Sequence, residues 1–90
     1  MFKVKLSEAT PTILAFDGEI LECFFDEGGS RRVHITHIKS ILFETTGKGK
    51  HLLTIQHKYE PISLWVDDEA VVKVTECVSQ IQKAMTNFQL

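Results

Sequence analysis

The chain has 90 residues, of which 43% are hydrophobic and 24% are charged, and its formal net charge is −2. This length fits one domain, and the composition is that of a folded globular protein, which excludes a disordered segment. Its apolar runs are far shorter than the ~20 residues of a membrane-spanning helix, so a transmembrane segment is excluded as well. Because the N-terminal residues also lack the apolar core of a signal peptide, we expect a cytoplasmic protein.

The first part of the chain alternates between apolar and polar residues, which is typical of half-buried strands. This pattern predicts strands over residues 2–6, 12–16 and 20–25. Asp17 and Gly18 separate the second strand from the third, and glycine readily adopts the positive φ that a tight hairpin turn requires. An antiparallel hairpin is therefore expected here.

The alternation continues as far as residue 66, with one break. Four more strands are expected over residues 32–36, 41–45, 52–57 and 62–66. Between the first two of them, Ile35, Ile38 and Ile41 are spaced three residues apart, which does not fit an extended strand. We therefore expect a single helical turn or a bulge at residues 37–40, where the chain changes direction.

The last part of the chain has the periodicity of an amphipathic helix. Its apolar residues are spaced by three or four positions, namely Val71, Val74, Val78, Ile81, Met85 and Phe88. Asp67 or Asp68 can cap the helix, which is expected over about residues 68–88. Because such a helix needs a surface to cover, we predict one domain over residues 1–90, mainly β with one helix (α+β). Its seven strands, over about residues 2–66, form a bent antiparallel barrel or sandwich capped by the C-terminal helix.

Three segments carry a resemblance to a known family: Phe24–Glu44 (FFDEGGSRRVHITHIKSILFE), Leu52–Gln56 (LLTIQ) and the terminal helix. Together they resemble the bacterial pleckstrin-homology-like (PH-like) domains, small proteins of poorly defined function, over about residues 12–88. In that family a strand ending in a basic residue leads into an I-x-x-I-x-x-I/V turn, which Ile35, Ile38 and Ile41 reproduce. The resemblance implies the pleckstrin-homology fold of seven strands and a capping helix.

Two departures from the family pattern argue against lipid binding. Phosphoinositide-binding members carry basic residues in the loop between the first two strands, whereas this loop, at residues 7–10, holds Glu8 and no basic residue. Eukaryotic members carry a tryptophan in the terminal helix, whereas the single tryptophan of this chain is Trp65 in the last strand. A shared fold is in any case a weak guide to function.

Several apolar residues are predicted to point away from the core. Trp65 shares its face with Ser63, and outward tryptophans are enriched at interface hot spots. The alternative is a ring that lies over the neighbouring strand or against Tyr59. The interface candidates are Trp65, Tyr59, Ile20, Phe24 and Leu42. If they gather in one patch, the patch favours self-association.

Positive charge is concentrated in the middle of the chain, where residues 31–58 hold six basic residues and one acidic residue, Glu44. Such a segregation can mark an anionic partner. The anion-binding candidates are Arg31, Arg32, Lys48, Lys50 and Lys58. A lipid headgroup or a nucleic acid is the corresponding ligand. The alternative, which we favour, is that these residues belong to the solvated outer face of three adjacent strands.

The sequence offers little for catalysis or metal binding. His34 and His37 are the nearest approach to a metal pair, but the chain has no CxxC or HExxH spacing, so we expect no metal site and no cofactor. The glycines and lysines of residues 47–50 lead into a strand and not a helix, which favours a hairpin turn over a phosphate loop. Cys23 and Cys77 are interpreted as buried reduced thiols, with a strand-to-helix disulfide as the alternative.

No catalytic constellation is therefore predicted, and we expect a protein that is not an enzyme. The preferred function is a non-catalytic binding or assembly module that acts through protein–protein contacts, with self-association as one form. An anionic-ligand module that uses the basic residues at 31–58 is the first alternative. A small enzyme is the second, and it requires a concave pocket with convergent polar groups.

Overall fold

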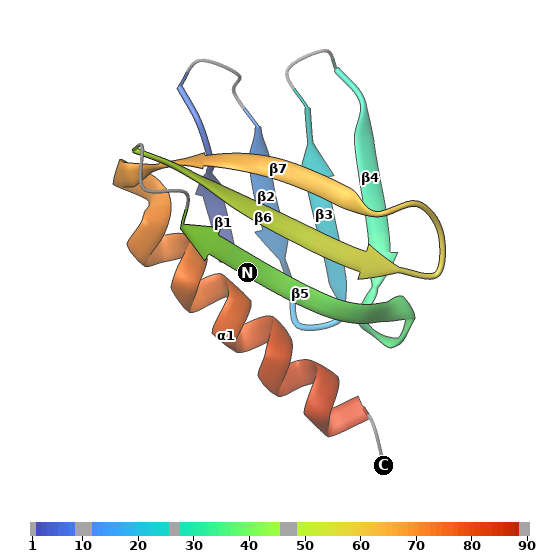
Figure 1. Ribbon diagram of the computed structural model, residues 1–90. Helices are drawn as coiled ribbons and strands as arrows, with labels where there is room; N and C mark the ends of the chain where they lie inside the picture. Colours follow the sequence, from blue (N-terminus) through green and yellow to red (C-terminus); the bar gives the residue numbers. More distant parts are fainter. Residues whose placement is uncertain (1, 9–11, 26–27, 46–48, 89–90) are drawn as a thin grey trace.

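The computed structural model describes residues 2–8, 12–25, 28–45 and 49–88. Within these residues the chain forms seven strands followed by one long helix (Figure 1). The elements are β1 (Phe2–Lys5), β2 (Ile13–Phe16), β3 (Ile20–Phe24), β4 (Ser30–His34), η1 (Ile35–His37), β5 (Ile38–Thr45), β6 (Lys50–His57), β7 (Ile62–Asp67), η2 (Asp68–Ala70) and α1 (Val71–Phe88). The mainly β architecture with a single C-terminal helix is confirmed.

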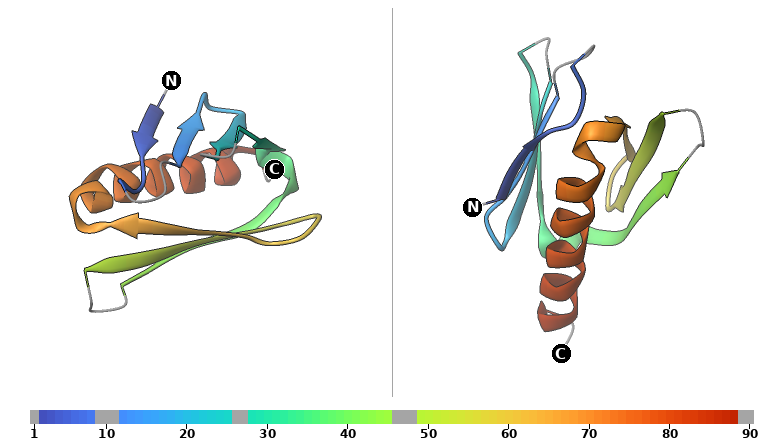
Figure 2. Two further views of the ribbon diagram at one scale, coloured as in Figure 1. Left: turned by 90° about the horizontal axis from the view of Figure 1, so that it is seen from above. Right: turned by 90° about the vertical axis from the view of Figure 1, so that its left-hand side faces the viewer.

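The strands divide into two antiparallel sheets, one in the order β1-β2-β3-β4 and the other in the order β5-β6-β7. The described strands do not close into a barrel. The two sheets cross one another, and α1 lies along the open side between them (Figures 1 and 2). The layered arrangement follows from the alternation along each strand, because each sheet has one apolar face that must be covered.

The chain passes from the first sheet to the second through η1. The predicted turn is displaced: η1 occupies Ile35–His37 rather than residues 37–40, and β5 begins at Ile38 with a register shift between Ile38 and Ser40. The spacing of three residues fits this geometry, because Ile35, Ile38 and Ile41 are all buried although the backbone turns between them. His34 caps η1, since its Nδ1 accepts a hydrogen bond from the Thr36 N–H (3.2 Å).

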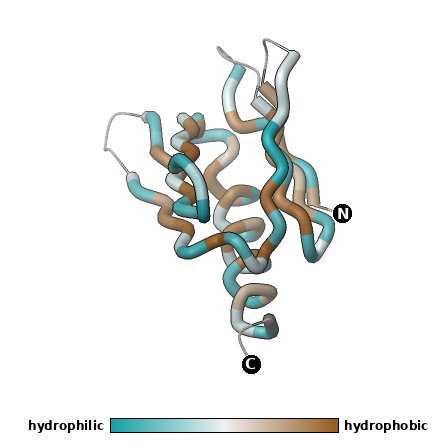
Figure 3. The backbone as a smooth tube through the Cα atoms, turned by 90° about the vertical axis from the view of Figure 1, so that its right-hand side faces the viewer, coloured by the Kyte–Doolittle hydropathy of each residue, from teal (hydrophilic) through white to brown (hydrophobic). Residues whose placement is uncertain are grey.

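The helix packs its apolar stripe into the core. Val74, Cys77 and Ile81 are fully buried, and Val78 is 9% exposed. These helix residues form one core cluster with apolar residues of both sheets. Hydrophobic and hydrophilic residues alternate along the strands that supply them (Figure 3). Cys77, which the periodicity places beside the stripe, is thus at its centre. Phe88 belongs to α1, but its side chain lies outside the described residues.

The helix starts later than predicted, because η2 precedes it. Asp67 flanks η2 but makes no capping hydrogen bond there. Instead, its carboxylate accepts a hydrogen bond from the Glu8 N–H (3.0 Å), and its own N–H donates to the Leu6 carbonyl (2.8 Å). These bonds tie the end of β7 to the chain that leaves β1.

The Asp17-Gly18 hairpin is confirmed. Gly18 has φ +105°, and the Asp17 carboxylate accepts hydrogen bonds from the N–H groups of Glu19 (2.9 Å) and Ile20 (2.7 Å). These two bonds stabilise the ionised carboxylate and lower its pKa, the Ile20 bond most strongly.

Candidate functional site

The most exposed apolar side chains of the β5–β7 sheet lie together on its outer face. Trp65 on β7 is directly opposite Leu52 on β6, and Leu42 on β5 is diagonal to Leu52. Trp65 and Leu42 are each 53% exposed, and Leu52 is half-buried between them. We call these three residues the Trp65 patch.

The alternation of the strands sets the direction of these side chains. Leu64 and Val66 flank Trp65 and are buried, so Trp65 must point to the opposite face. Leu53, which follows Leu52, is buried in the same way. Leu52 was not among the predicted interface residues, although the strand alternation already places it on the outer face.

The other predicted interface residues do not join this patch. Ile20 and Phe24 lie on β3, in the other sheet, where Phe24 is 38% exposed. Tyr59 lies in the turn between β6 and β7, with its ring edge against His57 (ring centroids 5.9 Å apart) and the Lys58 ammonium 5.9 Å from the ring centre. The five candidates are thus divided among two sheets and a turn.

The predicted basic residues are also dispersed. Arg31 and Arg32 are consecutive on β4 and therefore point to opposite faces; Arg32 lies 3.8 Å from the Glu22 carboxylate (Nε to Oε2). Lys50 is the first residue of β6 and Lys58 follows its last residue, so the two are roughly 25 Å apart along an extended strand. Lys48 lies outside the described residues.

The three strands of residues 31–58 are also split between the two sheets, since β4 belongs to one sheet and β5 and β6 to the other. They are therefore not three adjacent strands with one common outer face.

The two histidines near η1 lie close to each other. The rings of His34 and His37 are 6.3 Å apart, and His34 Nδ1 is 2.9 Å from the Thr36 hydroxyl. Over the described ranges, no group of three or more His, Cys, Asp and Glu residues is placed to hold an ion. The turn at residues 46–50 falls mostly outside those ranges; Gly49, within them, has φ +73°.

A polar pair that the sequence did not suggest joins β6 to the start of the helix. His51 is 7% exposed, and its Nε2 lies 2.6 Å from Asp68 Oδ1 in η2. Its Nδ1 is buried and has no partner in the described part of the chain. Strand alternation could have identified His51 as buried, because His51 and His57 share the inward face of β6 with Leu53 and Ile55.

His57 occupies the other end of the same inward face. Its Nδ1 accepts a hydrogen bond from the Tyr59 N–H (3.2 Å), so the proton of the neutral ring is on Nε2. Nε2 is buried and has no acceptor among the described residues. His57 is 7% exposed, and its ring packs against Tyr59 in the β6–β7 turn.

Both cysteines are free and fully enclosed in the core. Burial raises the pKa of Cys23 to about 12 and that of Cys77 to about 11, because the thiolate loses its hydration. The interpretation as buried reduced thiols is confirmed.

No family model matches the chain, and no curated protein has significant similarity to it. In the described residues, no helix has both the length and the apolar character that crossing a membrane requires.

Proposed function

We propose that this chain is a non-catalytic binding module of PH-like fold that self-associates through the Trp65 patch. The observation that carries this proposal is the exposure of Trp65 and Leu42 on one sheet face, on either side of Leu52. Trp is among the residues most enriched at interface hot spots, and clustered exposed apolar side chains on a small protein favour association.

The polarity of the surrounding face supports an interface. Thr54 on β6 is paired with Leu42, and Ser63 on β7 is paired with Thr54; both are uncharged. The charged neighbours lie at the rim of the patch: Glu44 on the edge strand β5, and Lys50 and Asp67, which are paired beyond Leu52 and Trp65. A centre depleted of charge with a polar rim is the usual composition of a protein–protein interface.

The occupant that we propose is a second copy of the chain. Around the patch the face carries Glu44 and the opposed pair Lys50 and Asp67, so charges of both signs can pair across a twofold axis between two copies. The outer face of a sheet is also a surface that can pack on its own copy, as two sheets do in a sandwich.

The PH-like assignment is part of the same proposal. Its support is the element order, with four antiparallel strands, a corner at Ile35, Ile38 and Ile41, three more strands and a helix along the open side. The alternative function, an anionic-ligand module, has less support, because the described basic residues do not converge on one surface.

The test is the molar mass in solution, measured by light scattering after size-exclusion chromatography at low and high salt. We expect a mass above the 10.2 kDa of one chain at both salt concentrations, because apolar association is not screened by ions. The Leu42→Ser/Trp65→Ser variant should elute as a folded monomer, with an unchanged far-UV circular dichroism spectrum.

Two control variants locate the interface. Val72 is 70% exposed on α1, so Val72→Ser removes apolar surface elsewhere and should leave the mass unchanged. Phe24→Ser does the same on the β1–β4 sheet. A wild-type monomer at both salts would refute self-association, and dissociation by Phe24→Ser alone would assign the interface to the other sheet.

A further inference from the structure

The outer edge of β1 presents backbone groups that no described strand pairs. β1 ends its sheet, and only β2 lies beside it. Leu6 N–H donates to the carbonyl of Thr12, the residue that precedes β2 (2.8 Å). Alternate residues of an antiparallel strand direct their N–H and C=O groups to the same side. The backbone groups of Val4 therefore also point to β2, and those of Lys3 and Lys5 point away from it. The N–H and C=O groups of Lys3 and Lys5 are therefore placed to pair with an added strand.

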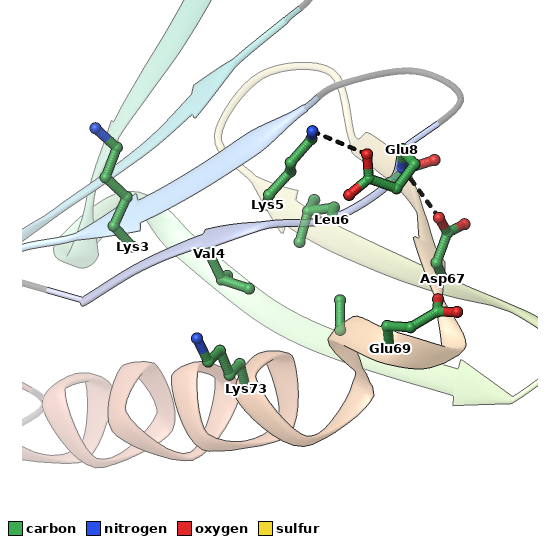
Figure 4. A pocket seen from close by; sticks show the side chains of 10 residues that line it. Lys3, Val4, Lys5, Leu6, Glu8, Asp67, Glu69 and Lys73 are labelled. Carbon is green, nitrogen blue, oxygen red and sulfur yellow. Dashed lines mark hydrogen bonds and ion pairs between the residues drawn. The ribbon is translucent and has the colours of Figure 1, made fainter.

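A groove runs along this open edge, between β1 and the start of α1 (Figure 4). Its volume is about 380 Å³, and its lining includes Val4, Leu6 and Ala70, each of which is nearly or fully buried. A second hollow of about 290 Å³ lies at the Phe2 end of β1, between the β2–β3 hairpin (Phe16, Asp17 and Gly18) and Gln80 of α1. The seam between strand and helix is thus hollow on both sides of Lys3.

The charges along the groove are unevenly arranged. Lys3 and Lys5 extend from β1 away from the helix, and Lys73 extends from α1 towards β1 (Figure 4). The acidic residues of the lining are Glu8, Asp67 and Glu69, all at the Lys5 end. Glu8 forms an exposed ion pair with Lys5 (3.1 Å), which water screens strongly. Lys3 is therefore farther from negative charge than Lys5.

These lysines restrict which strand can add to the edge. A second β1 in antiparallel pairing, centred on Val4, would place Lys3 directly opposite Lys5 of the other copy. Like charges in directly opposed cross-strand positions are destabilising, whereas opposite charges there are favourable. The edge thus disfavours its own copy and favours a strand with acidic side chains.

We propose that β1 binds an extended acidic segment of another protein, which adds to the β1–β4 sheet as a further strand. Two acidic side chains, two residues apart, lie opposite Lys3 and Lys5. The residue between them is apolar and faces the groove floor formed by Val4, Leu6 and Ala70. Backbone hydrogen bonds to Lys3 and Lys5 supply affinity, and the alternating side chains supply specificity. Asp67 is bonded to the chain just beyond Lys5, to the Leu6 carbonyl and the Glu8 N–H, so we place the added strand along Phe2–Lys5 only.

The experiment measures binding of a capped seven-residue peptide in which Glu alternates with Val, with a Lys–Val peptide of the same length as the control. We expect the wild-type protein to bind the Glu–Val peptide only. The Lys3→Glu/Lys5→Glu variant should bind it about tenfold more weakly or worse, and should instead bind the Lys–Val peptide. The matched variant Lys39→Glu/Lys58→Glu has the same change in net charge elsewhere and should bind as the wild type does.

Lys5→Pro and Lys5→Ala both remove the Lys5 charge, and only the proline variant also removes the backbone N–H. Their comparison therefore separates strand addition from attraction between charges, and Lys5→Ala should keep part of the binding. Lys5→Pro removes an N–H that points away from β2, a change that edge strands tolerate. It should abolish binding while the circular dichroism spectrum and melting temperature stay close to wild type. In the wild type, the Lys3 and Lys5 amides should gain protection from hydrogen exchange when the peptide binds. Equal binding of both peptides, or undiminished binding by folded Lys5→Pro, would overturn the proposal.

Discussion

At the residue scale, the pair of His51 and Asp68 is the polar contact on which stability should depend most. The ring is buried and the carboxylate is 2.6 Å away, so Asp68→Ala leaves a buried N–H without a partner. Loss of such a partner costs about 1–3 kcal/mol of unfolding free energy, measured by urea denaturation. Glu69→Ala is the matched control, because Glu69 is also acidic and exposed in the same turn. Equal losses in the two variants would mean that the pair adds nothing beyond the charge at the helix start.

The buried thiols give a second prediction at this scale. The pKa of each thiol is raised in the folded protein, to about 12 for Cys23 and about 11 for Cys77. The unfolded chain ionises first, near ~8.5, so it binds fewer protons above that pH and the folded state loses stability. The stability that the buried neutral thiols contribute is fully present at pH 7. It is lost from about pH 8.5 upwards, up to about pH 11 for Cys77 and about pH 12 for Cys23. In the same pH range, unfolding of the Cys23→Ala/Cys77→Ala variant should show a smaller decrease than that of the wild type. Parallel pH profiles would contradict the prediction.

Of the residues in these two predictions, the sequence identified Cys23 as buried but did not identify the partner of His51. Cys23 follows from strand alternation, since it shares a face with Leu21. The partner of His51 does not follow, because Asp68 is 17 residues away and the twist that brings η2 over the end of β6 is a property of the folded sheet.

At the element scale, α1 should be the part of the fold that is least tolerant of charge. Val78 is a buried residue of the stripe (9% exposed), and Val78→Asp places a carboxylate among apolar side chains without a partner. This should cost about 3 kcal/mol or more, enough to unfold a small domain in thermal denaturation. Ser79→Asp, one residue along the same helix and exposed, should melt near the wild-type temperature. A folded Val78→Asp variant would show that the stripe is not part of the core.

Strands and helix were predictable at this scale because each has a regular period. The corner was displaced by two residues, since the spacing of Ile35, Ile38 and Ile41 fixes that the chain turns but not where the turn begins. The division of the strands into two sheets could not be predicted from the alternation either. Alternation shows which face of a strand is apolar, and it does not show at which connection hydrogen bonding passes to another sheet.

At the scale of the whole molecule, the two proposed surfaces lie on different layers. The Trp65 patch covers the outside of the β5–β7 sheet, and the peptide edge is the free side of β1 in the other sheet. The two surfaces share no residue, so occupation of one should not block the other. Effects at separate sites without common partners are usually additive.

This separation predicts the behaviour of the two variants in combination. The Leu42→Ser/Trp65→Ser monomer should bind the Glu–Val peptide with the dissociation constant of the wild type and one peptide per chain, measured by titration calorimetry. Conversely, Lys5→Pro should keep the wild-type molar mass in light scattering, because β1 takes no part in the proposed self-association. If the monomeric variant lost the peptide while staying folded, the edge would depend on the assembly. The protein would then have one composite site, in which self-association positions β1 for its partner.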